Sequence, residues 1–80
     1  MADWDGDGWT ADAVNYYDSQ GEFHEGYPVD LSDTTSVTIH METDDGRDFY
    51  YDLLTEGDMG YWDIWVDIQD AYDADYDTAK

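Results

Sequence analysis

The side chains that could do chemistry in this chain are carboxylates, and four of them near the N-terminus are spaced like metal ligands. Alternating aspartates and a glycine match the D-x-D-x-D-G opening of a calcium loop: Asp3, Asp5, Asp7 and Gly8. Asp12 could close a shorter loop of this kind. Position 12 of an EF-hand needs a bidentate glutamate, and that position is Val14. Calcium binding through these four aspartates is therefore an alternative, and the absence of any cofactor is the leading expectation.

Nucleophilic or acid–base catalysis has little support in the sequence. The chain has no cysteine, and its serines lie in no strand–turn–helix context that would expose a nucleophile. The two imidazoles, His24 and His40, are too few for a zinc site. Carboxylate pairs must occur among 22 acidic residues, so they indicate no acid–base centre. We expect a protein that is not an enzyme.

The net charge of −20 decides which class of partner is expected. Arg47 and Lys80 are the basic residues against 22 acidic ones. Such a surface is repelled by nucleic acid and by anionic membranes, so we expect a basic DNA-binding protein or nucleoprotein complex as partner. A net charge of about 2–8 keeps a small domain soluble, so solubility explains this excess poorly. No segment has the ~20 apolar residues of a membrane span, and the first residues lack the basic start of a signal peptide. We therefore expect a cytoplasmic protein.

Residues 36–69 are predicted to form the sheet that positions the carboxylates. Three segments there alternate apolar and polar side chains with the period of a half-buried strand. Their apolar sides are Val37, Ile39 and Met41; Phe49, Tyr51 and Leu53; and Trp62, Ile64, Val66 and Ile68. An Asp-Asp-Gly turn within 43–47 joins the first two segments as a short hairpin. The pattern predicts a three-stranded antiparallel meander with one apolar and one acidic side.

A helix over residues 10–20 is predicted to cover the apolar side of this meander. Thr10 can cap its N-terminus, Asp12 lies in the first turn, and Gly21 can end it. Its central residues 14–17 fit a strand equally well. The expected fold class is α+β, with one N-terminal helix packed on a small antiparallel sheet, and with a fourth edge strand within 23–31 as an option. Residues 1–80 make a single domain, which begins with an acidic, glycine-rich arm (1–9) and ends with an acidic tail (70–80).

The acidic side of the meander is the predicted partner-binding face. Carboxylates four residues apart on one strand lie about 13 Å apart, and the next strand lies ~4.8 Å away, so the charge density approaches that of a phosphate backbone. Two aromatic rings among the carboxylates could stack on arginine. The predicted face comprises Glu42, Asp44, Asp45, Asp48, Tyr50, Asp52, Asp63, Trp65, Asp67 and Asp70.

In its size, its net charge, its scarcity of Lys and Arg and its acidic surfaces bearing Tyr and Trp, the chain resembles DNA mimics encoded by phages and mobile elements. This class includes anti-restriction and acidic anti-CRISPR proteins, and the resemblance is one of composition over the whole chain rather than of a motif. It implies a stoichiometric inhibitor, a monomer or homodimer, in the cytoplasm of a bacterial host cell during infection. Such an inhibitor occupies the basic DNA-binding surface of a host defence nuclease or CRISPR surveillance complex. A halophilic acidic protein of unrelated function is the other alternative, because molar salt also favours many acids and few lysines.

Overall fold

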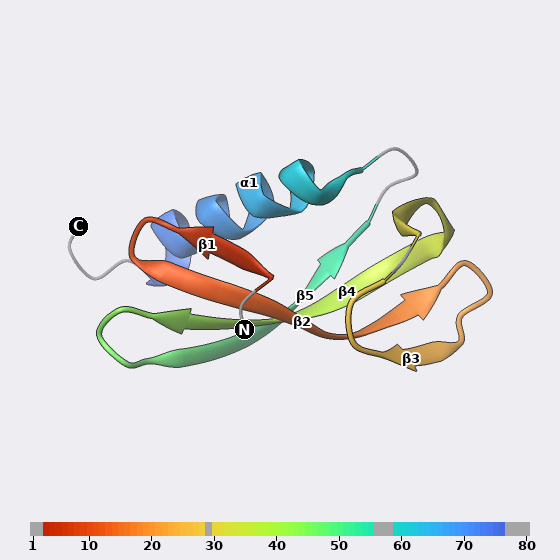
Figure 1. The fold of residues 1–80 in the computed structure, drawn as a ribbon, viewed down its shortest axis with the longest axis horizontal. Helices are drawn as coiled ribbons and strands as arrows, with labels where there is room; N and C mark the ends of the chain where they lie inside the picture. The colour runs from red at the N-terminus through yellow and green to blue at the C-terminus, as the bar shows by residue number, and fades with distance from the viewer. Residues whose placement is uncertain (1–2, 29, 56–58, 77–80) are drawn as a thin grey trace.

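Antiparallel strands dominate the computed structural model, which describes residues 3–28, 30–55 and 59–76 and has five strands within those ranges (Figure 1). The strands are β1 (Trp4–Gly6), β2 (Trp9–Asp18), β3 (Phe23–Glu25), β4 (Thr34–Thr43) and β5 (Asp48–Leu54). Their order in the sheet is β1-β2-β4-β5, and β3 pairs with the second half of β2, on the edge that β1 occupies along the first half. A 3₁₀ turn (Leu31–Asp33) precedes β4. The helix α1 (Tyr61–Ala71) and a π-helical turn (Tyr72–Tyr76) follow β5.

The predicted N-terminal helix over 10–20 is wrong, because those residues form most of β2. Trp9, Ala11 and Ala13 are buried in alternation, and β2 pairs with β4 along its length. The register shifts after Ala13, which leaves Val14 as the extra residue of a β-bulge, and beyond it Tyr16 packs against the core again. The β-branched and aromatic residues in this segment favour a strand, and pairing on both edges outweighs the weak capping signals at Thr10 and Gly21.

The predicted hairpin between the first two segments of the meander is confirmed. β4 and β5 are antiparallel, with Ile39 opposite Tyr51 and His40 opposite Tyr50. Gly46 adopts a φ of +89° in the turn, and its N–H donates to the Thr43 carbonyl. Glycine tolerates this left-handed conformation without the steric cost that a Cβ brings. The alternation of apolar and polar residues therefore predicted correctly which residues of these two strands share a side of the sheet.

The third predicted strand is wrong, because residues 61–71 form α1. A strand would place Trp62, Ile64, Val66 and Ile68 on one side, whereas the helix buries Ile64 and Ile68 and leaves Trp62 66% and Val66 38% exposed. Buried positions four residues apart are the period of a helix. The Asp63 carboxylate accepts from the Gly60 N–H and so caps the helix N-terminus, where a negative charge is favoured.

Helix α1 covers one side of the sheet, and β1 closes the core beside it (Figure 1). Three indole N–H groups join α1 to the first hairpin: Trp4 donates to the Tyr61 carbonyl, Trp9 to Gln69 Oε1, and Trp65 to the Asp5 carbonyl. The segment predicted as an acidic arm therefore contains a core strand. The buried apolar core comprises Trp4, Trp9, Ala11, Ala13, Val37, Ile39, Met41, Leu53, Ile64 and Ile68.

The first part of the predicted acidic tail is helical and packs on the sheet. The Tyr76 ring stacks on Phe49 with ring centroids 4.0 Å apart, and Arg47 Nη2 donates to the Tyr76 carbonyl at 2.9 Å. The optional edge strand of the sequence interpretation corresponds to β3 at Phe23–Glu25. Val29, residues 56–58 of the second connection and residues 77–80 of the tail lie outside the described residues. In the described ranges, no helix combines the length and the apolarity needed to cross a bilayer.

Candidate functional site

The side of the sheet opposite α1, here called the open face, carries the outward side chains of β1, β2, β4 and β5. Register places Glu42 opposite Asp48, His40 opposite Tyr50, and Thr38 opposite Asp52. The β5 residues Asp48, Tyr50 and Asp52 are all exposed, Tyr50 by 65%. The predicted partner-binding residues Glu42, Asp48, Tyr50 and Asp52 are therefore brought together on one surface.

Cross-strand contacts order the polar groups of the open face. Thr38 Oγ1 donates to Asp52 Oδ1 at 2.9 Å, and His40 Nε2 lies 3.0 Å from Asp48 Oδ1. The His40 and Tyr50 rings lie 4.8 Å apart. These contacts hold the side chains of Asp48, Tyr50 and Asp52 to β4, so the two carboxylates project from fixed positions.

The open face also includes two carboxylates from the N-terminal hairpin. Asp5 lies opposite Thr10, Thr10 opposite Glu42, and Glu42 opposite Asp48, so Asp5, Glu42 and Asp48 belong to one row across the sheet. Asp12 lies opposite His40 in the next row. The sequence interpretation missed both aspartates for this face, because their sharing a side requires β1 and β2 to be recognised as strands.

Asp44 and Asp45 lie in the turn at one end of the open face. The Asp45 carboxylate accepts from the Thr43 hydroxyl, and Arg47 Nε lies 3.0 Å from both of its oxygens. The hydrogen bond from Thr43, followed by that from Arg47, holds the pKa of the Asp45 carboxyl below its usual value. Arg47 is thereby committed to this turn and to the Tyr76 carbonyl.

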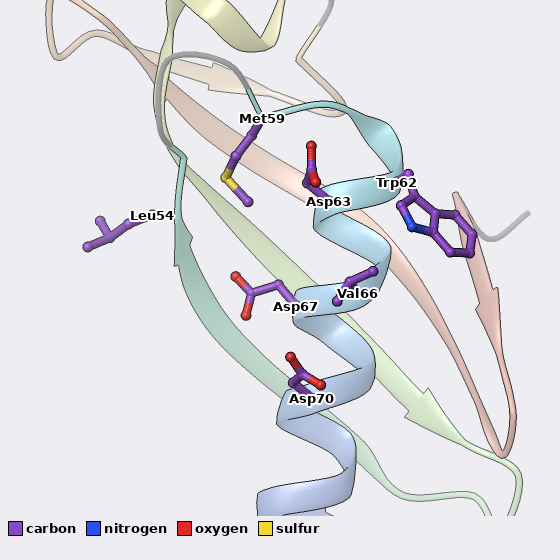
Figure 2. A pocket seen from close by; sticks show the side chains of 7 residues that line it. All are labelled: Leu54, Met59, Trp62, Asp63, Val66, Asp67 and Asp70. Atoms are coloured by element: carbon purple, nitrogen blue, oxygen red, sulfur yellow. The ribbon is translucent and has the colours of Figure 1, made fainter.

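The remaining predicted face residues, Asp63, Trp65, Asp67 and Asp70, lie on α1 and so on the other side of the sheet. The three aspartates, without Trp65, line an open groove of about 420 Å³ between α1 and the end of β5 together with apolar residues (Figure 2). The lining of this groove is Leu54, Met59, Trp62, Asp63, Val66, Asp67 and Asp70. The structure therefore divides the predicted face into two separate acidic surfaces. The apolar lining was missed because it was assigned to a strand core, although helical spacing already relates Trp62 to Val66 and Asp63 to Asp67.

Asp67 lies between Asp63 and Asp70 on the side of α1 that lines the groove. Burial, followed by the charge of Asp70, raises the pKa of the Asp67 carboxyl above its usual value. Figure 2 shows the Asp67 side chain pointing toward β5. There, burial followed by the nearby Asp67 charge raises the pKa of the Tyr51 hydroxyl, whose oxygen is buried and has no hydrogen-bond partner among the described residues.

The predicted calcium ligands are not gathered round one point. The Asp3 N–H donates to Asp12 Oδ1 at 3.0 Å, and Asp3 Oδ2 accepts from the Ala13 N–H at 2.9 Å, so both carboxylates close the end of the β1–β2 ladder. Asp5 lies within β1 and Asp7 in the turn that follows. Within the described ranges, the groups of at least three candidate metal ligands are instead Asp18, Glu22 and His24, and His40, Glu42 and Asp48.

The cluster around His24 borders a second cavity, of about 240 Å³, lined by Tyr16, Asp18, His24, Asp30 and Asp33. Asp18 Oδ1 accepts from two backbone N–H groups, and its Oδ2 lies 2.8 Å from His24 Nε2. The hydrogen bond with His24 is the main reason that the pKa of the Asp18 carboxyl is lowered. A cation at this cluster would have to displace that contact, so the arrangement serves first to hold β3 on β2.

Comparison with known proteins adds no assignment. No family model matches the chain, and neither the curated proteins nor the solved structures include a significant match.

Proposed function

We propose that this protein is a DNA-mimicking inhibitor, which occupies the basic DNA-binding surface of a host defence nuclease or a CRISPR surveillance complex. The observation that carries the proposal is the open face. Its carboxylates lie in cross-strand rows, and in the described ranges their one imidazole neighbour is His40, already paired with Asp48. A basic groove that receives DNA supplies the cations that this face lacks.

The overall charge density supports the same proposal. The described residues include 19 acidic side chains and Arg47, a net charge of −18, in a molecule 39 Å long. That is about one net charge per 2 Å of length, against one per ~1.7 Å along duplex DNA. A surface that needs only solubility has no reason to approach this value, because a net charge of about 2–8 suffices.

The test is capture of a nucleic-acid-binding effector from bacterial lysates that contain restriction and CRISPR systems, with tagged protein as bait near 0.1 M salt. Short duplex DNA should displace the captured effector, and raised salt should weaken the complex steeply, because each phosphate-like contact is electrostatic. An effector that DNA cannot displace would contradict the proposal.

A matched pair of baits tests the open face itself. The first carries Glu42→Gln, Asp48→Asn and Asp52→Asn, and the second carries Asp7→Asn, Glu22→Gln and Asp75→Asn at exposed positions elsewhere. Both lose the same charge, so a general attraction would weaken equally in the two. We expect the first bait to lose capture at least tenfold more than the second, since several charge-assisted contacts are removed together.

A further inference from the structure

The groove between α1 and the end of β5 combines exposed apolar side chains with carboxylates. Trp62 and Val66 contribute exposed apolar surface from α1, and Leu54 borders the groove at the end of β5 with its side chain directed away from the helix (Figure 2). Asp63, Asp67 and Asp70 follow one side of the helix next to them (Figure 2). Apolar surface is costly to expose in a chain of 80 residues, and a rim of charges around it is typical of a protein-binding site.

The three carboxylates have no cation of their own in the described part of the chain. The ion pairs there join His24 to Asp18, His40 to Asp48, and Arg47 to Asp45. Arg47, the sole lysine or arginine in those ranges, is held in the β4–β5 turn and on the Tyr76 carbonyl. Within the described ranges, the groove is thus an anionic site without a paired lysine or arginine, which a cationic side chain of a partner can occupy.

The apolar rim of the groove is ordered before any partner arrives. The Trp62 ring stacks on Trp65 at 4.8 Å with an interplanar angle of 7°. Trp65 in turn donates its indole N–H to the Asp5 carbonyl at 2.7 Å and packs near Trp9. A ring that is already fixed loses little side-chain entropy on binding, and tryptophan is enriched among residues that dominate interface energies.

From this geometry we propose that the groove binds a short segment of the partner protein in which arginine is flanked by aliphatic side chains. The guanidinium group lies against Asp67 and its neighbours Asp63 and Asp70, because planar guanidinium pairs with carboxylates through two parallel hydrogen bonds. The aliphatic side chains lie on Trp62 and Val66. This inference depends on the proposed function for the identity of the partner as a basic protein, and it adds a contact that DNA itself could not make.

Charge complementarity makes such a segment a better occupant than a second copy of this chain. Two copies would bring together acidic grooves, since each described surface carries a large excess of carboxylates. A small apolar molecule would leave the Asp67 carboxylate desolvated and unpaired, which costs free energy. A segment with arginine and aliphatic side chains pairs with the carboxylates of the lining and covers its apolar residues.

The test uses the intact protein and three blocked peptides of equal length. The first alternates Arg with Leu, the second alternates Arg with Gly, and the third alternates Gln with Leu. Titration is followed by the backbone and indole N–H signals in NMR spectra. We expect the Arg–Leu peptide to bind most tightly, and its largest shifts to fall on the Trp62 indole and on Val66 and Asp67.

Variants of matched chemistry separate the groove from general attraction. Trp62→Ala and Asp67→Asn should each weaken the Arg–Leu peptide about fivefold, the loss expected for one apolar contact or one partly exposed charge pair. Their controls at the β2–β3 end of the sheet, Phe23→Ala and Glu22→Gln, remove an exposed ring and an exposed charge that belong to neither the groove nor the predicted face. The controls should change binding less than twofold.

Three results would overturn the inference: equal weakening by the groove variants and their controls, an Arg–Gly peptide that binds as well as Arg–Leu, or shifts that concentrate on the open face. The outcome is independent of the capture experiment. If DNA fails to displace the captured effector while the peptide maps to the groove, the mimic function falls and the groove remains. If displacement succeeds and the peptide does not use the groove, only the groove inference falls.

Discussion

The two sides of this sheet differ in how much each depends on the rest of the fold. On the side under α1, Val37, Ile39 and Met41 are completely buried beneath a helix that comes from a distant part of the chain. On the open face, Thr38, His40 and Glu42 of the same strand pair with neighbours on β2 and β5, and their side-chain hydrogen bonds in the described part of the chain run to β5. The covered side therefore carries stability, and the open face is left available for electrostatic recognition.

The largest expected difference in the free energy of unfolding between variants on the two sides comes from Ile68→Ala. Ile68 is fully buried against the sheet, so truncation should cost about 2–5 kcal/mol through lost burial and a residual cavity. A domain of this size has little stability to spare, so a large unfolded fraction should result. Tyr50→Ala on the open face should change the free energy of unfolding by less than about 0.5 kcal/mol. Urea unfolding followed by tryptophan fluorescence measures both, and equal losses would mean that the open face is also packed.

Gly6→Ala should give the next largest loss of stability. A Cβ at Gly6 would lie 1.9 Å from the Trp9 ring, so Trp9 or β1 must move. Overpacking of this kind costs about 1–3 kcal/mol. Asp5→Ala, one residue earlier on the open face, is the control and should be nearly neutral. Thermal melts compare the two, and an undisturbed Gly6→Ala variant would argue against the close contact of β1 with the core.

Tyr51→Phe, on the covered side of the sheet, should stabilise the protein. The buried Tyr51 hydroxyl has no partner in the described part of the chain, and such a group costs about 1–3 kcal/mol when it leaves water unpaired. Removing it should therefore raise the melting temperature. Tyr50→Phe is the exposed counterpart and should leave the melting temperature unchanged. A lower melting temperature for Tyr51→Phe would show that the hydroxyl is satisfied, for instance by water.

The smallest expected effect is on the pH dependence of the free energy of unfolding, to which Asp67 and Asp45 should contribute with opposite signs. The pKa of Asp67 is raised above its usual value of 3.8 by burial, so its ionised form destabilises the native state, and this penalty disappears as the pH falls through the raised pKa. The pKa of Asp45 is lowered from 3.8 by Thr43 and Arg47, so its contribution is present above 3.8 and is lost as the pH falls through the lowered pKa.

Asp67→Asn should therefore stabilise the protein at pH 7, with the gain vanishing below pH 3.8. Asp45→Asn should destabilise the protein at pH 7, with a loss that shrinks in acid. Melting temperatures measured across this pH range give both signs. The same sign for the two variants would mean that overall charge, rather than the local environment, governs their titration.

The sequence predicted the central hairpin but not the elements on either side of it. Period-two alternation fixes which side each residue of β4 and β5 faces, and the Asp-Asp-Gly turn fixes their register. Residues 61–71 alternate in the same way, yet Ile64 and Ile68 also satisfy the helical spacing of four, so the pattern has two solutions. Only packing on the sheet selects the helix.

The candidate site likewise has one part that the sequence predicted and one part that it did not. The part within the hairpin, Glu42, Asp48, Tyr50 and Asp52, could be placed on one surface from alternation. Asp63, Trp65, Asp67 and Asp70 could not, because assigning them to a helix moves them to the other side of the sheet. Their groove also needs Leu54 from β5, a neighbour that the local sequence around α1 does not reveal.

By itself, the sequence determined the charge, the absence of cysteine, the aromatic content and the two-sided character of the hairpin, since these depend on residue types and nearest neighbours alone. The tertiary structure decided that 10–18 is a strand, that 61–71 is a helix, and that the acidic residues form two surfaces rather than one. The physical reason is that both segments have weak local preferences, whereas burying Trp9, Ile64 and Ile68 together yields more free energy than any cap or turn signal supplies.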